Sequence, residues 1–72
     1  MGMYELLSRA IIVQAAHDYR KAWKYLKMCP GDEIKQAEID EIERFFLSQW
    51  FGTLTDVDGA GLLRKLKQEV LA

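Results

Sequence analysis

The chain contains few of the residues on which cross-linking and metal chemistry depend. Its 72 residues include one cysteine, one histidine and one proline. Because the single thiol of Cys29 cannot form an intrachain disulfide, a disulfide-stapled secreted scaffold is excluded and a reducing compartment is favoured. The most apolar stretch, residues 10–16, is too short to cross a bilayer. Gly2 does not begin an N-myristoylation motif, because Leu6 stands where Ser or Thr is required. We therefore expect a cytoplasmic protein with no membrane attachment.

The sequence offers no recognisable metal site. His17 and Cys29 would lie ~18 Å apart along one helix, and a structural zinc site needs four such ligands. The turn Asp56-Val57-Asp58-Gly59 is similar to the middle of a calcium-binding loop. With Gly59 at the sixth loop position, however, Leu54 and Lys65 fall where two acidic ligands are required. We expect no bound metal, and the two aspartates are better explained by a turn and a helix cap.

Catalytic constellations are equally hard to find. Ser8, Ser48 and Cys29 share a single histidine as their only base, and none lies in a Gly-rich elbow or an oxyanion loop. The carboxylates of residues 32–43 form a solvated run with no apolar pocket that would raise a pKa. We expect no enzymatic activity, no cofactor and no small-molecule substrate.

Apolar residues at three- and four-residue steps predict an all-α, three-helix domain covering residues 1–72. The helices are expected at about residues 4–28, 32–51 and 57–71. A short corner at Pro30 makes the first two a long antiparallel hairpin, to which the shorter C-terminal helix is added. The apolar stripes of the three helices are Leu7, Ile11, Ala15, Tyr19, Ala22 and Leu26; Ile39, Ile42, Phe46 and Trp50; and Leu62, Leu63, Leu66 and Val70.

Capping residues mark the helix ends. Asp32 is a good N-cap for the second helix, and Gly52 is expected to end it. Thr55 with Asp58 three residues later is similar to a capping box before the third helix. Gly59 costs about 1 kcal/mol inside a helix, so it either shifts the start towards Asp58 or lets the backbone approach a neighbour closely.

Charge is unevenly distributed although the net charge is only −1. Residues 1–30 carry five basic and two acidic side chains, whereas residues 31–51 carry two basic and six acidic ones. In an antiparallel hairpin these segments lie side by side. We therefore expect ion pairs between the first and second helices, each worth ~0.2–1 kcal/mol.

One functional hypothesis is nucleic-acid binding through a helix-turn-helix-like arrangement. The segment from Arg20 to Lys27 interleaves cations with aromatic rings, which suits phosphate contacts and base stacking. The candidate residues are Arg20, Lys21, Lys24 and Lys27. Against this hypothesis, the chain is acidic overall, and the acidic second helix is expected to neutralise the same cations.

The other hypothesis starts from the aromatic residues. Four of the eight fall within residues 45–51, and adjacent helical positions point about 100° apart. A domain of this size cannot easily bury all of them, so the surplus either widens the rim of the core or forms a surface for a protein partner or for self-association. The candidate anchors are Trp23, Tyr25, Trp50 and Phe51. This hypothesis makes the chain a non-enzymatic interaction or regulatory module.

Two segments also carry a family resemblance. The stretch from Glu43 to Phe51, followed by Leu54 to Gly59 and Leu63, together with residues 18–22, resembles small uncharacterised helical proteins encoded by prophages and integrative elements of Gram-positive bacteria. The resemblance implies a small helical domain in a bacterial or phage cytoplasm. It is compatible with a regulator of element genes, an accessory to DNA transactions or an inhibitor of a host system.

Overall fold

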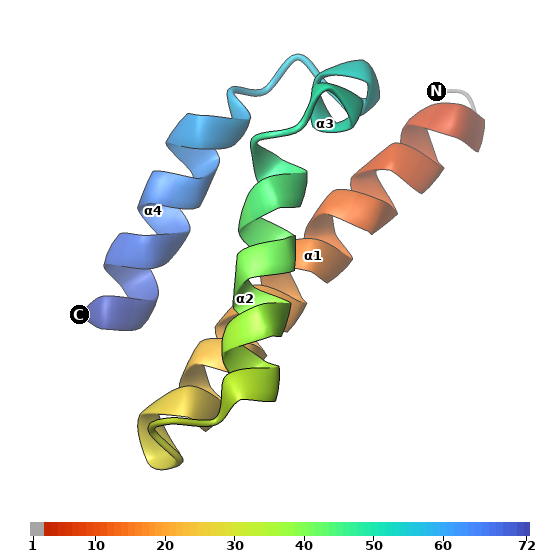
Figure 1. Cartoon of the computed structure of the whole chain (residues 1–72). Coiled ribbons are helices and arrows are strands. Elements are labelled where there is room, and N and C mark those ends of the chain that lie inside the picture. The colour runs from red at the N-terminus through yellow and green to blue at the C-terminus, as the bar shows by residue number, and fades with distance from the viewer. Residues whose placement is uncertain (1–2) are drawn as a thin grey trace.

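The computed structural model describes residues 3–72, which form four helices and no strand (Figure 1). They are α1 (Met3–Met28), α2 (Glu33–Phe46), α3 (Gln49–Leu54) and α4 (Gly59–Leu71). The all-α prediction is confirmed, but the expected three helices are four. Gly2, considered above for N-terminal modification, lies outside the described residues.

The corner between α1 and α2 contains the predicted turn glycine and the predicted helix N-cap. Gly31 adopts a positive φ of 93°, which glycine tolerates because it has no Cβ. Asp32 is the N-cap of α2, and its carboxylate accepts a hydrogen bond of 3.0 Å from the Lys35 backbone N–H. The chain therefore reverses in four residues, and α2 runs back antiparallel to α1 (Figure 1).

The predicted second helix, residues 32–51, is interrupted at Leu47 and Ser48. The Ser48 hydroxyl donates to the Phe45 carbonyl at 2.7 Å and accepts from the Phe51 N–H at 3.2 Å, so it caps α3. On one continuous helix Phe46 and Phe51, five positions apart, would point about 140° away from each other. The break brings their rings to 5.5 Å and buries both. Burial of two phenyl rings is the physical reason why the helix does not continue.

The two predicted caps around α3 and α4 also differ from expectation. Gly52 lies inside α3, which ends at Leu54, instead of ending the second helix. The Thr55 hydroxyl accepts from the Val57 N–H at 3.2 Å, a local turn in place of a capping box. Asp58 is the N-cap of α4 without a side-chain capping bond.

Gly59 begins α4 where that helix touches the end of α2. A Cβ atom at this position would collide with the Phe46 carbonyl oxygen and crowd the Phe51 ring at 2.9 Å. The close backbone approach suggested by the glycine is therefore present. It places α4 alongside α2, where α4 packs on both helices of the hairpin (Figure 1).

All four helices contribute to one core. Its buried side chains are Tyr19 and Ala22 from α1, Ile39 and Phe46 from α2, Phe51 from α3, and Leu63 and Leu66 from α4. Most of them belong to the predicted apolar stripes. Leu7, Ile11 and Trp50 belong to those stripes too, but their side chains are exposed.

Helix lengths explain the exposure of the two α1 residues, Leu7 and Ile11. With ~1.5 Å per residue, the 26 residues of α1 extend ~39 Å, whereas the 14 residues of α2 extend ~21 Å. The first half of α1 therefore runs past the end of α2 and is accompanied mainly by the short α3 (Figure 1). No helix within residues 3–72 combines the length and the apolarity that a membrane span requires.

Candidate interaction surface

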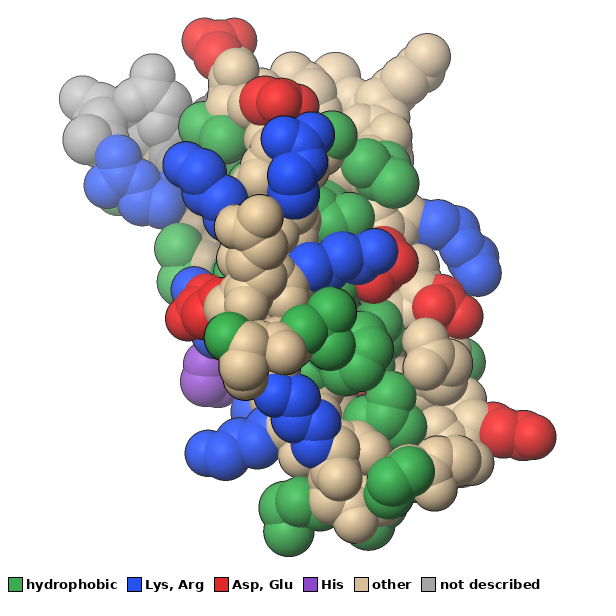
Figure 2. Space-filling view, turned by 90° about the vertical axis from the view of Figure 1, so that its left-hand side faces the viewer, with side chains coloured by type: hydrophobic (Ala, Val, Ile, Leu, Met, Phe, Trp, Pro, Cys, Tyr) green, Lys and Arg blue, Asp and Glu red, His purple; other side chains and the backbone are tan. Residues whose placement is uncertain are grey.

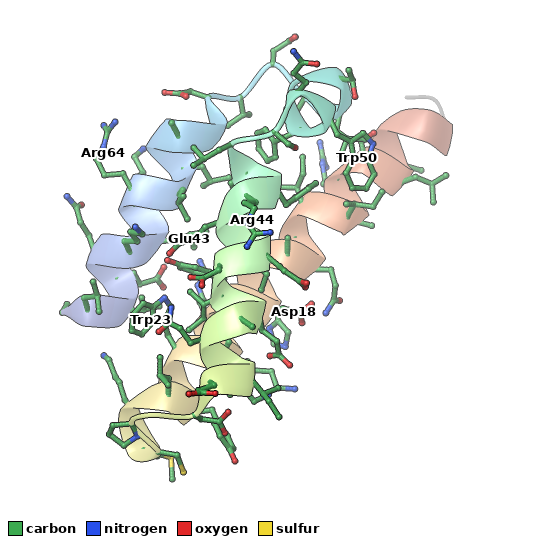
Figure 3. All side chains as sticks on the ribbon, viewed as in Figure 1. Asp18, Trp23, Glu43, Arg44, Trp50 and Arg64 are labelled. Carbon is green, nitrogen blue, oxygen red and sulfur yellow. The ribbon has the colours of Figure 1, made fainter. Side chains whose placement is uncertain are left out.

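The four predicted aromatic anchors have different environments. Phe51 is 2% exposed and belongs to the core, so its side chain is not presented to a partner in this fold. Trp50 is 56% exposed, Tyr25 is exposed, and Trp23 is half-buried. The structure does not bring these rings together into one patch: Trp50 and Trp23 lie on different sides of the molecule (Figure 3).

Trp50 is held in place although it is exposed. It lies in the first turn of α3, directly after the Ser48 cap, and its ring meets the Phe45 ring edge-on at 5.2 Å. Phe45 in turn contacts the buried Phe46 and Phe51 rings at 5.5 and 5.6 Å. A chain of ring contacts thus leads from the core to the surface, and such a preorganised ring loses little entropy when a partner binds it.

Trp50 closes one end of a groove between α1 and α2. Two adjoining hollows of about 430 and 300 Å³ share Asp18, Glu41 and Ile42, so they form one continuous depression along the hairpin. We name it the α1–α2 groove. The Trp50 end is lined by Ile11, Gln14, Ala15, Phe45 and Trp50, and the other end by Lys21, Ala22, Tyr25, Lys35 and Glu38.

The middle of the groove is acidic. Asp18 accepts a hydrogen bond of 2.9 Å from the Gln14 amide, which carries no charge. Glu41 makes no ion pair with any described residue. Figure 3 shows Asp18 on α1 beside the flank of α2. The centre of the groove therefore presents two carboxylates that form no ion pair with any described residue.

The far end of the groove is partly neutralised. The Lys35 ammonium pairs with Glu38 at 3.3 Å and lies 5.0 Å from the centre of the Tyr25 ring. The exposed Tyr25 ring therefore already contacts the Lys35 ammonium. The two ends expose similar amounts of apolar surface, and the Trp50 end exposes much less polar surface.

Trp23 faces the other side of α1, towards α4 (Figure 3). Its ring meets the Tyr19 ring edge-on at 6.5 Å, and its buried Nε1–H has no hydrogen-bond acceptor in the described part of the chain. It also lines a hollow of about 560 Å³ beside Pro30. Trp23 thus forms the rim of the core.

Tyr19 joins three helices through a polar contact beside this rim. Its side chain is 0% exposed, and its hydroxyl donates to Glu43 of α2 at 2.8 Å. Lys67 of α4 approaches the same Glu43 oxygen at 3.6 Å. Burial, followed by the adjacent Glu43 carboxylate, raises the pKa of Tyr19 from 10.0 to about 12. The arrangement joins α1, α2 and α4.

The ion pairs differ from those expected for the hairpin. Arg20 pairs with Glu69 of α4 at 3.1 Å, and no ion pair joins α1 to α2 among the described residues. Lys21, Lys24 and Lys27 are exposed, and no described carboxylate lies within ion-pairing distance of them. On the α4 side of the molecule, basic side chains are interspersed with acidic ones and apolar surface (Figure 2).

Sequence reasoning missed the groove itself. It assigned Ile11 to an apolar stripe, placed Trp50 both in a stripe and among the candidate anchors, regarded Glu41 as part of a solvated run and gave Asp18 no role. The available signal was the difference in length between the first helix and its partner, which leaves apolar positions of the longer helix uncovered. Among the described side chains, those of residues 6–72, no three His, Cys, Asp or Glu come together as a metal site would require.

The comparisons with known proteins identify no relative. No family model, no curated protein and no solved structure matches the chain. The resemblance to proteins of prophages and integrative elements therefore stays a prediction.

Proposed function

We propose that the chain is a small, non-enzymatic interaction or regulatory module that binds another protein through the Trp50 end of the α1–α2 groove. The observation that carries the proposal is the exposure of Trp50 at the end of a chain of ring contacts from the core. Tryptophan is among the residues most enriched at interface hot spots, and a ring fixed by packing binds at low entropic cost.

The surroundings of Trp50 support an interface. Ile11 and Leu47 are exposed, and Ile42 and Phe45 are only partly buried, so apolar surface continues from α3 onto both hairpin helices. Apolar surface of this kind, bordered by polar side chains, is typical of binding sites in small proteins. The resemblance noted above supports a setting in a phage or mobile element, in the bacterial cytoplasm.

A second candidate is nucleic-acid binding through the basic face of α1. It is favoured by the three exposed lysines, Lys21, Lys24 and Lys27, that lack a carboxylate partner among the described residues. It is disfavoured by the ion pair that occupies Arg20 and by the net charge of −1.

Affinity capture from a Gram-positive host lysate separates the two candidates. Three tagged baits are compared, each with and without nuclease: wild type, Trp50→Ala, and the double variant Lys24→Glu with Lys27→Glu, whose two positions do not line the groove. We expect a stoichiometric protein that survives nuclease, is lost with Trp50→Ala and is retained by the double variant. Recovery of nucleic acid that depends on Lys24 and Lys27, with every protein lost on digestion, would reverse the assignment.

A further inference from the structure

We infer that the occupant of the α1–α2 groove is an amphipathic helix that carries Lys or Arg beside its apolar face. The inference rests on the proposed function and adds the chemistry of the partner. It is built from the walls of the groove, from its apolar end and from its two unpaired carboxylates.

The walls determine the kind of backbone that fits. Both are helices, whose main-chain groups hydrogen-bond within the helix, and residues 3–72 contain no strand whose edge could pair with an extended peptide. Recognition must therefore use side chains. A groove between two helices accepts the ridge of a third, with anchors at i, i+3, i+4 and i+7.

The length of the groove is suited to a short helix. On the α2 wall it extends from Lys35 to Phe45, which is ~15 Å at 1.5 Å per residue. About three turns of a partner helix span that distance. Large apolar side chains of the partner would contact Ile11, Phe45 and Trp50 at one end.

Charge determines the remaining chemistry. In the same hollow as Trp50, the groove presents Asp18 and Glu41, which form no ion pair with any described residue. Lys35 is held by Glu38 and by the Tyr25 ring, so its charge is compensated locally. Lys21 lies at the far end. A partner helix with a cation opposite Asp18 and Glu41 supplies the missing charge, and an acidic side chain there would be repelled.

The test uses two synthetic helical peptides of about five turns that lack tryptophan. Both carry the same leucine face; one has lysines flanking it, and the other has glutamates in their place. Binding to the full chain is followed by tryptophan fluorescence. We expect the lysine peptide to bind about tenfold more tightly than the glutamate peptide at low salt, with the difference shrinking as salt rises.

Matched variants assign that preference to the groove. The double variant Asp18→Asn with Glu41→Gln should lose most of the preference for the lysine peptide. The double variant Glu33→Gln with Asp56→Asn removes the same charge from exposed positions outside the groove and should keep that preference unchanged. Equal binding of the two peptides, or an equal effect of both double variants, would overturn the inference.

Other occupants give distinct results. A dimer in sedimentation that dissociates on Trp50→Ala and is not displaced by the lysine peptide would assign the groove to a second copy of the chain. If neither peptide binds but the captured protein still depends on Trp50, the partner chemistry is wrong and the proposed function stands. If the capture fails as well, both are wrong.

Discussion

Two serines show how the surroundings of one residue decide its effect on stability. Ser8 of α1 is 3% exposed, and its hydroxyl has no hydrogen-bond partner among the described residues, whereas Ser48 caps α3 with two hydrogen bonds. Ser8→Ala should raise the free energy of unfolding by ~1 kcal/mol, because it removes an unsatisfied buried hydroxyl and favours the helix. Ser48→Ala should lower it by ~1 kcal/mol through the lost cap. Urea denaturation of both variants measures whether the unfolding free energy changes in opposite directions. A lower unfolding free energy in Ser8→Ala would contradict an unsatisfied buried hydroxyl at this position.

Tyr19 gives the fold a pH dependence on the alkaline side. Its pKa is raised to about 12, so the fold favours the neutral phenol. The stabilisation is complete below the unfolded pKa near 10 and is lost as the pH rises towards 12. Because lysines titrate in the same range, the measurement is the difference in unfolding free energy between wild type and Tyr19→Phe. We expect this difference to shrink between pH 10 and 12, and a constant difference would show that the phenol is not held neutral by Glu43 and burial.

At the scale of elements, Gly59 decides how α4 joins α2. Gly59→Ala should destabilise the chain by about 1–3 kcal/mol, because a Cβ has no room beside the Phe46 carbonyl. Gly52 is the matched control, because it lies inside α3 and a methyl group there would meet no atom within 4 Å. Gly52→Ala should stabilise by ~0.5–1 kcal/mol. Thermal unfolding should give a lower melting temperature for Gly59→Ala than for Gly52→Ala. Equal melting temperatures of the two variants would contradict the close approach at Gly59.

The elements were predictable where local signals are strong. Pro30, Gly31 and Asp32 fix the first corner, and the sequence identifies all three. The break at Ser48 was missed, because an aromatic-rich segment resembles a continuous helix until the burial of Phe46 and Phe51 is considered together. That burial is a tertiary effect, which the periodicity of a single helix does not contain.

At the scale of the molecule, Trp50 and Phe51 have different roles although they are neighbours in the chain. Phe51→Ala should cost ~3–5 kcal/mol and largely unfold a domain of this size. Trp50→Ala should cost ~1 kcal/mol, mainly from the lost edge contact with Phe45. Circular dichroism during chemical denaturation measures both. A Trp50→Ala variant that unfolds would place this ring in the core and remove it from the surface.

The candidate site was predictable in its residue types and not in its location. The aromatic surplus indicates a surface, and Trp50 is on it, but the same reasoning included Phe51, which is in the core. The groove depends on which parts of α1 are left uncovered by α2, α3 and α4. That follows from relative helix lengths, which the sequence indicates, and from the break at Ser48, which appears only when the helices are assembled.

The most direct test of the central claim follows the two tryptophan indole N–H signals in a ¹⁵N NMR titration of the 72-residue chain. The titrant is the protein retained on the nuclease-treated bait. Trp50 lines the groove, and Trp23 lies on the other side of α1, so the two signals report on different surfaces. We predict that the Trp50 signal shifts or broadens as the partner is added while the Trp23 signal stays in place. Movement of Trp23 alone, or of neither indole, would contradict binding at the α1–α2 groove.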